Sequence, residues 1–110
     1  YKKASKTITV TVNPKSTVLT KLTNPSAQKI KAVWKRRSKV SGYQIRYSAD
    51  SSFTSSRKVT VKKNTTLKTT LSKSIKKGKT YYVRIRTYKT VDGRNYYSGW
   101  SKAMKIRVTK

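Results

Sequence analysis

The chain of 110 residues has no cysteine, no histidine and only two acidic residues, Asp50 and Asp92. The side chains that most often bind zinc, or that act in pairs as general acid and base, are therefore missing or too few. Serine and lysine could each supply a nucleophile, but no motif places one beside an activating group. We therefore expect no enzymatic activity, no metal and no cofactor.

The absence of cysteine also excludes a disulfide, although it does not fix the compartment. A chain of this length amounts to one domain, and it can bury a modest core without a cross-link. No apolar stretch is long enough to cross a bilayer, so we expect no membrane span. Because the sequence begins with Tyr1 rather than methionine, we expect a fragment or a processed chain.

Negative charge is almost absent, since 29 lysine and arginine residues against two acids give a formal net charge of +27. Repulsion among these cations opposes compaction, so salt or a bound polyanion should stabilise the fold. Soluble proteins normally carry charges of both signs on their surface, so a need for solubility does not explain why acidic residues are so few. The charge therefore indicates a negatively charged polymer as partner, bound with a strong dependence on salt.

The apolar residues that are present alternate with polar ones, which is the pattern of half-buried strands. The alternation is clearest over residues 80–108, where one face is mostly apolar and the other carries arginine and tyrosine. Asp92-Gly93 lies between the two halves and predicts a tight hairpin turn, because glycine tolerates the positive φ that such a turn needs. One face of this hairpin is expected to pack in the core, and the other carries guanidinium groups and aromatic rings. We expect the rest of the chain to pack around this hairpin.

Shorter alternating stretches separated by turn signals fill the rest of the sequence. They lie at residues 7–12, 30–34, 43–48, 58–62 and 67–71, and a further segment begins at Lys15 with Leu19 and Leu22 as its apolar anchors. Phe53 is expected to pack under the turn at Asp50. No stretch has a helical period over a useful length, so the pattern predicts an all-β sandwich of seven strands with an extra N-terminal strand. The predicted core residues are Trp34, Tyr43, Ile45, Leu71, Tyr81, Val83, Ile85 and Ile106.

Four pieces of the sequence, in this order and at this spacing, resemble a fibronectin type III domain. They are I-K-A-V-W at 30–34, G-Y-Q-I-R-Y at 42–47, I-K-K-G-K-T-Y-Y-V-R-I-R at 75–86 and Y-S-G-W-S at 97–101. The resemblance covers residues 15–110 and implies an Ig-like sandwich with Trp34 in the core. It also implies that Tyr81 is a tyrosine corner, with its hydroxyl bonded to backbone upstream, although Lys77 stands where the family often has proline. The last piece is similar to the W-S-x-W-S box of class I cytokine receptors.

Lysine-rich sequences of this kind most resemble repeat modules in surface and secreted proteins of Gram-positive bacteria. The resemblance implies a non-enzymatic adhesion or spacer module, extracellular or on the cell surface in association with the cell wall. Together with the charge, it implies as partners an anionic polysaccharide or teichoic acid, extracellular DNA and neighbouring modules of the same protein. Two alternatives stay open, a structural repeat or fibre subunit that assembles by strand donation and a dedicated nucleic-acid binder.

The candidate contact residues for an anionic polymer lie on the outward face of the hairpin sheet. They are Arg46, Tyr82, Arg84, Arg86, Tyr88, Trp100, Lys105 and Arg107. Arg84 and Arg86 are expected to flank the indole of Trp100, where each stacking contact contributes roughly 0.5–1 kcal/mol at an exposed site. The same guanidinium groups could pair with sulfate, phosphate or carboxylate, since a stacked arginine keeps outward donors free. The tripeptide at 92–94 is D-G-R rather than R-G-D, which favours a turn over an adhesion motif.

Residues 1–14 lie outside the resemblance and contain a strand of their own. Ile8, Val10 and Val12 alternate with threonines there, and an isolated strand would leave its backbone groups unpaired. Because residues 15–110 already hold a full set of strands, we expect residues 1–14 to be the terminal strand of a preceding Ig-like module, or a strand between modules.

Deletion of residues 1–13 is therefore expected to leave the domain folded. The circular dichroism spectrum and the melting temperature should change little, because the remaining strands make up the whole sandwich. A truncated protein that unfolds or aggregates would show instead that this segment is integral to the domain.

Overall fold

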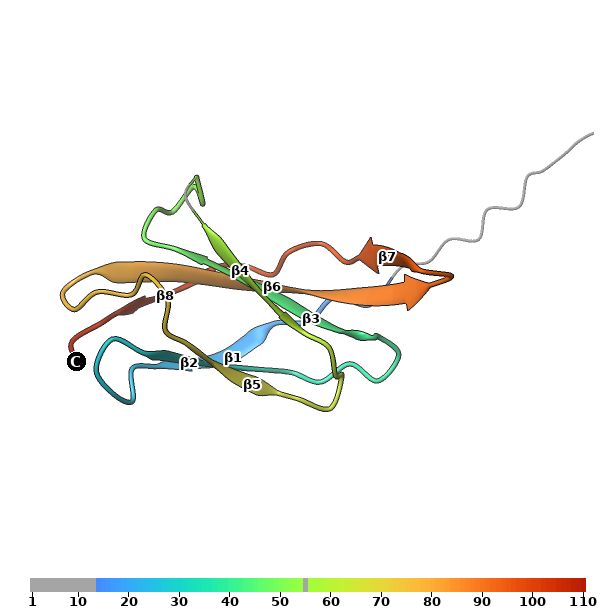
Figure 1. Ribbon diagram of the computed structural model, residues 1–110, viewed down its shortest axis with the longest axis horizontal. Coiled ribbons are helices and arrows are strands. Elements are labelled where there is room, and N and C mark those ends of the chain that lie inside the picture. The colour runs from blue at the N-terminus through green and yellow to red at the C-terminus, as the bar shows by residue number, and fades with distance from the viewer. Residues whose placement is uncertain (1–13, 55) are drawn as a thin grey trace, which may run out of the picture.

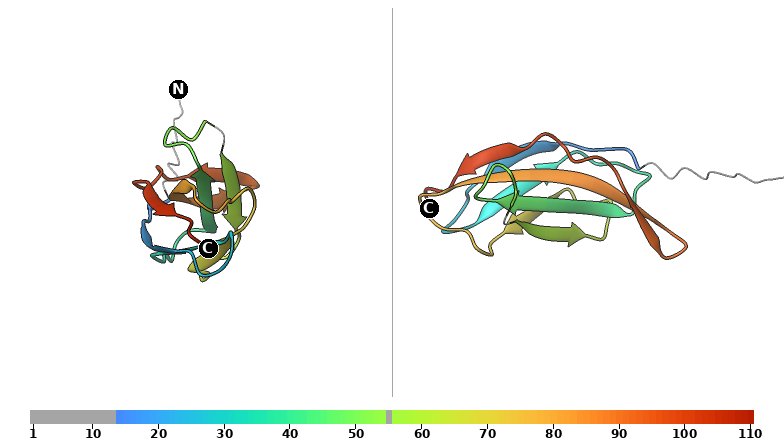
Figure 2. Two further views of the ribbon diagram at one scale, coloured as in Figure 1. Left: turned by 90° about the vertical axis from the view of Figure 1, so that its left-hand side faces the viewer. Right: turned by 90° about the horizontal axis from the view of Figure 1, so that it is seen from above.

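The computed structural model describes residues 14–54 and 56–110, which form two antiparallel sheets packed face to face (Figure 1). One sheet has three strands in the order β1 (Leu19–Thr23), β2 (Ile30–Trp34) and β5 (Lys68–Leu71). The other has five, with β4 (Arg57–Val61) beside β3 (Gly42–Ser48), β3 beside β6 (Thr80–Val91), and both β7 (Arg94–Tyr97) and β8 (Met104–Arg107) paired with β6. The described residues contain no helix. The predicted all-β sandwich is confirmed, and the end-on view in Figure 2 shows its two layers.

The last of the seven expected strands is divided, which is why the described part has eight strand segments. β7 pairs with the end of β6, from Tyr88↔Tyr97 to Val91↔Arg94, and β8 pairs with its beginning, from Thr80↔Arg107 to Val83↔Met104. Both segments therefore follow the same edge of the long strand β6, with residues 98–103 between them. The additional strand predicted within residues 1–13 lies outside the described residues.

Alternation places the predicted core between the sheets. Seven of the eight predicted core side chains are at most 3% exposed, and the exception is Ile106, which packs against the core but stays half-buried. Ile106 lies on β8 at the edge of its sheet, opposite Tyr81. The last buried position is instead Val108, where backbone bonds from Gly78 N to Val108 O (2.7 Å) and from Val108 N to Lys79 O (2.9 Å) draw the chain inward.

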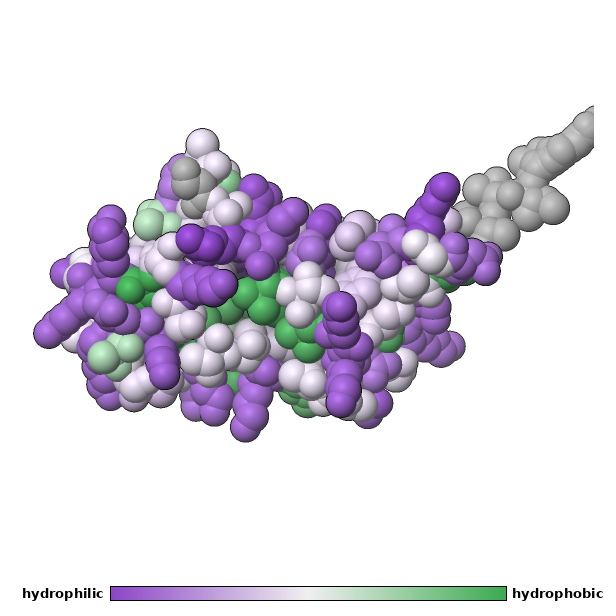
Figure 3. Space-filling view, viewed as in Figure 1, coloured by the Kyte–Doolittle hydropathy of each residue, from purple (hydrophilic) through white to green (hydrophobic). Residues whose placement is uncertain are grey.

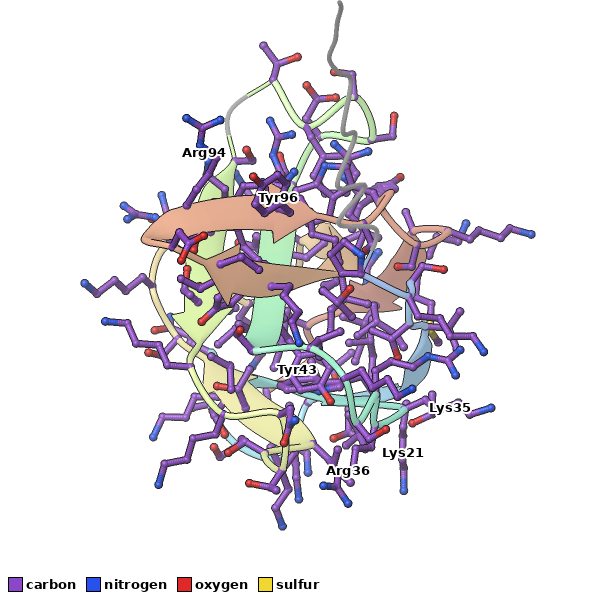
Figure 4. All side chains as sticks on the ribbon, turned by 90° about the vertical axis from the view of Figure 1, so that its right-hand side faces the viewer. Lys21, Lys35, Arg36, Tyr43, Arg94 and Tyr96 are labelled. Carbon is purple, nitrogen blue, oxygen red and sulfur yellow. The ribbon has the colours of Figure 1, made fainter. Side chains whose placement is uncertain are left out.

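The charged side chains surround this core. Figure 4 shows Tyr43 between the layers, whereas Lys21, Lys35 and Arg36 extend away from the sandwich. In Figure 3 hydrophilic side chains cover most of the visible face, and apolar atoms show mainly along the seam between the sheets. The fold thus distributes like charges over its surface, where water screens them.

Two local devices predicted from the sequence are confirmed. The hydroxyl of Tyr81 donates to Ser74 O (3.0 Å) and accepts from Lys76 N (2.7 Å), which fixes the loop before β6 as a tyrosine corner. Asp92 and Gly93 have φ values of 51° and 76°. Positive φ at both central residues defines a type I′ turn, whose twist matches that of the flanking strands.

Gly42 begins β3 at a point where two neighbouring groups approach its backbone. A Cβ atom there would lie 2.0 Å from Val61 O and 2.9 Å from the hydroxyl oxygen of Tyr88. Backbone cannot move aside as cheaply as the end of a flexible side chain. The position therefore requires glycine for space.

Gly42→Ala is expected to lower the free energy of unfolding by about 1–3 kcal/mol, the usual cost of overpacking. Gly99→Ala is the matched control, because a Cβ at Gly99 would meet nothing within 4 Å, and its effect should stay within about 0.5 kcal/mol. Urea denaturation measures both variants. Equal stability of the two would contradict the steric role of Gly42.

Candidate functional site

The outer face of the five-stranded sheet carries most of the candidate residues in cross-strand rows. Arg84 lies opposite Arg46, which in turn lies opposite Lys58 on β4. The next row along β6 places Arg86 opposite Gln44. Because alternate residues of a strand point to the same side, all these side chains project away from the core.

Guanidinium groups and aromatic rings alternate along this face. Arg84 Cζ lies 4.2 Å from the centroid of the Phe53 ring and 4.9 Å from that of Trp100. Arg86 Cζ lies 4.4 Å from the Trp100 centroid and 3.8 Å from that of Tyr97. We call Phe53, Arg84, Trp100, Arg86 and Tyr97 the cation–aromatic ladder. Both arginines lie over the indole of Trp100, as expected, and the parallel orientation of their planes to the indole stays a prediction.

Phe53 reaches the ladder through the turn that Asp50 organises. The carboxylate of Asp50 accepts from Ser52 N (3.1 Å) and Ser52 Oγ (2.7 Å), and Phe53 N donates to Asp50 O (2.9 Å). Hydrogen bonds from Ser52 above all, and from Thr54, lower the pKa of Asp50. Phe53 adopts a left-handed φ of 57°, and its ring is 3% exposed. The turn therefore supplies one end of the ladder.

Two serines hold Trp100 in place where the last strand is divided. Ser98 N donates to Thr87 O (3.0 Å), while Ser98 Oγ accepts from Thr87 N (2.9 Å). Ser101 repeats the arrangement with Ile85, at 2.7 Å and 3.0 Å. The serine hydroxyls thus take the place of backbone carbonyls that a continuous strand would offer to β6. Trp100 can therefore depart from the strand and join the ladder, while the backbone N–H groups of Thr87 and Ile85 keep their hydrogen-bond partners.

The hydrogen bonds that Arg86 and Arg46 donate run to neutral acceptors. Arg86 donates through Nε (2.9 Å) and Nη2 (2.5 Å) to Gln44 Oε1. Arg46 donates through Nε to Ser56 Oγ (2.6 Å) and through Nη2 to Phe53 O (3.0 Å). Arg84 Nε is buried and has no partner among the described residues. The hydrogen bonds fix the guanidinium groups of Arg46 and Arg86 without neutralising their charge.

Burial has an electrostatic consequence for the two central arginines. It lowers the pKa of both Arg84 and Arg86 from their ordinary value, and the charge of Arg46 lowers both further. For Arg86 the neighbouring Tyr97 acts in the opposite direction. Arginine stays protonated in proteins, so the face keeps several crowded cations.

The structure places the remaining predicted residues differently from one another. Tyr82 is half-buried, and Lys105 and Arg107 are exposed on β8, opposite Tyr82 and Thr80. Tyr88 lies on the same face, but it is only 7% exposed, so a contact with a polymer could involve only the small part of its side chain that is accessible, and that role stays a prediction. Its ring covers Gly42 and lies beside Tyr97, with centroids 6.3 Å apart. Burial raises the pKa of Tyr88.

Sequence reasoning did not place Phe53, Tyr97 or Lys58 at this site. Phe53 was expected under its own turn, and the positive φ that turns it toward Arg84 leaves no pattern in the sequence. Tyr97 could have been found, because counting back across the Asp92-Gly93 turn pairs it with Tyr88. Lys58 alternates outward on β4, and only the register shows that it lies beside Arg46.

Within residues 14–54 and 56–110, no group of three or more histidine, cysteine, aspartate or glutamate side chains is placed to hold a metal ion. The same residues contain no helix that is long and apolar enough to span a membrane.

Comparison with known proteins identifies the architecture. No protein-family model and no curated protein matches the sequence. The FN1–FN3 domains of chicken CNTN1 superpose with a TM-score of 0.70 at 23% identity, over 86% of this chain and 31% of that one. The fn3 domain of human contactin 1 gives 0.68 at 17% identity, over 93% and 89%. The fold is that of a fibronectin type III domain.

These similarities concern the fold alone, because the sequence identities are low. The chain spans less than a third of the CNTN1 structure it matches. It also superposes on 13% of a β-1,2-glucanase chain from Parabacteroides distasonis, with a TM-score of 0.70 at 17% identity over 92% of this chain. A domain of this fold thus occurs as one part of longer chains of different kinds. The expected Gram-positive, lysine-rich subgroup stays a prediction.

Trp100→Ala is expected to lower the free energy of unfolding by about 1–3 kcal/mol, because it removes the ring that two guanidinium groups share. Trp100→Phe keeps an aromatic face in the same place and should lose clearly less. Urea denaturation of both variants measures the difference. If the alanine variant is as stable as the phenylalanine variant, the indole does not hold the ladder together.

Proposed function

We propose that this domain is a non-enzymatic adhesion and spacer module of a bacterial surface or secreted protein, located outside the cell. In this proposal it binds an anionic polymer, either a cell-wall polymer such as teichoic acid or a host glycan, on the outer face of the five-stranded sheet. The observation that carries the proposal is the row Lys58, Arg46 and Arg84, in which each cation lies directly opposite the next.

Such a row is unfavourable in the absence of a counter-charge. Like charges directly opposite one another on neighbouring strands destabilise a sheet, and strands are only about 4.8 Å apart. The hydrogen bonds that hold Arg46 run to Ser56 and to a backbone carbonyl, which are neutral. A chain of sulfate, phosphate or carboxylate groups crossing the strands would offset the repulsion at each cation.

The ladder supports the proposal because it removes conformational freedom in advance. Arg84 and Arg86 are each held between two rings, so little side-chain entropy remains to be lost on binding. Lys58, Lys105 and Arg107 are exposed and flank the ladder on β4 and β8. We infer that the exposed cations make first contact with the polymer, while the ladder presents a rigid positive surface between them.

The placement of the chain ends suits a spacer. The described part begins in the half of the molecule that carries β7, and Lys110 lies at the opposite end (Figure 1). Asn24 Oδ1 accepts from the backbone N of both Thr109 and Lys110, at 2.9 Å and 2.8 Å. A module whose described part begins and ends at opposite sides of the sandwich can be repeated along a chain, with the same face presented at intervals.

The test is a salt series of binding to heparin, purified teichoic acid and double-stranded DNA. Lys58→Gln/Lys105→Gln removes two exposed cations from the proposed face, and it should lower the slope of log Kd against log salt by about two for the bound polymer. Lys21→Gln/Lys68→Gln removes the same charge from the three-stranded sheet and should leave affinity nearly unchanged.

The outcomes separate the alternatives. Equal loss in the two double variants would mean that only net charge matters and would contradict a binding face. Binding of DNA alone would favour the nucleic-acid alternative. Binding to none of the three would leave a structural repeat, whose proposed strand donation concerns residues outside the described part.

A further inference from the structure

We propose that a hollow at the β7 end of the outer face binds one acidic sugar ring, a hexuronate unit, of the anionic polysaccharide. This inference rests on the proposed function and names the unit that would be recognised. The hollow has a volume of about 350 Å³ and lies between β4, β3, β6 and β7. That volume is at the small end of the usual range for ligand pockets.

The chemistry of the lining suits a sugar rather than an apolar ligand. Seven of the eight lining side chains carry a hydroxyl or an amide, and the eighth is Lys62. None is aliphatic and none is acidic. Neutral donors and acceptors match the hydroxyls of a pyranose ring, and the single ammonium group matches one carboxylate on it.

Tyr88 supplies a hydroxyl that has no partner within the described protein. Its side chain is 7% exposed and lines the hollow. Its oxygen is not among the enclosed polar atoms that lack a partner, so it can be reached from the hollow, where the hydroxyl can donate a hydrogen bond to a ligand group.

Two amides have their carbonyl oxygens already occupied. Asn95 Oδ1 accepts from Thr90 Oγ1 (2.6 Å), and Gln44 Oε1 accepts twice from Arg86. Their NH₂ groups are therefore the parts left to meet a ligand, and Gln44 Nε2 makes only a long contact of 3.5 Å to Thr60 Oγ1. Amide donors of this kind bond to sugar hydroxyls or to a carboxylate.

Tyr97 provides a stacking surface at the rim. Its side chain is 43% exposed even though Arg86 lies over its ring, 3.8 Å from the centroid. The Tyr88 and Tyr97 rings are tilted by 49° to one another and form two walls of the hollow. An apolar face of a sugar ring can pack against Tyr97 while its polar edge meets Tyr88, Asn95 and Lys62.

The experiment measures binding of trigalacturonate by isothermal titration calorimetry. Tyr88→Phe removes the hydroxyl and keeps the ring over Gly42, so it should weaken binding about 3- to 10-fold, the effect of one hydrogen bond, without lowering the melting temperature. Lys62→Gln should weaken binding by a similar factor. Lys63→Gln is the matched control, because Lys63 is the exposed neighbour of Lys62 and does not line the hollow.

Two further probes separate the sugar from its charge. Fully methyl-esterified trigalacturonate keeps the ring and loses the carboxylates, so its weaker binding should respond to Tyr88→Phe and not to Lys62→Gln. Inorganic tripolyphosphate has charge but no ring, and Tyr88→Phe should not change its binding.

If both variants bind trigalacturonate as the unaltered protein does, while heparin still binds, the hollow is not a sugar site and the proposed function stands. If trigalacturonate, heparin and teichoic acid all fail to bind, the proposed function fails as well.

Discussion

The stacking of Arg84 and Arg86 between aromatic rings is the interaction on which the outer face depends. With two acids for 29 basic residues, carboxylates cannot accompany most of the cations that alternation brings together on a sheet. The negative face of a ring attracts a cation without carrying a charge of its own. Aromatic rings therefore hold the guanidinium groups in position and leave the face strongly positive. Ion pairs with carboxylates would hold them as well, but they would neutralise the charge.

This arrangement explains why the last strand is divided. A continuous strand along β6 would keep Trp100 in the alternation and in line with its neighbours. The break at residues 98–103 frees the indole to lie between two arginines that are two residues apart on β6, and Ser98 and Ser101 complete the hydrogen bonding of β6 across the break. The Y-S-G-W-S segment thus places the Trp100 ring beside Arg84 and Arg86. In exchange, the edge strand is divided into two shorter segments.

The sequence predicted those parts of the fold that depend on alternation and turn chemistry, and it missed those that depend on register and backbone reversal. The buried set of β2, β3 and β6, the tyrosine corner and the Asp92-Gly93 turn follow from local pattern. Ile106 was misplaced because the pattern gives the side of a strand but not how far its edge is covered. The pattern places Tyr88 on the outer face, but it cannot show that the ring folds over Gly42 and is largely buried there. Phe53 joins the ladder because its backbone has a positive φ, which the periodicity of the sequence does not predict.

Charge links the stability of this domain to its proposed binding, and the two respond to salt in opposite directions. Repulsion within a net charge of +27 opposes folding, and it weakens as the Debye length shortens to about 10 Å at 0.1 M salt. Attraction to a polyanion weakens over the same range, because counter-ions compete for the same cations. A bound polymer also stabilises the folded state by mass action. At low salt, where the free domain is least stable, the polymer therefore contributes most, and folding and attachment favour one another on the same surface.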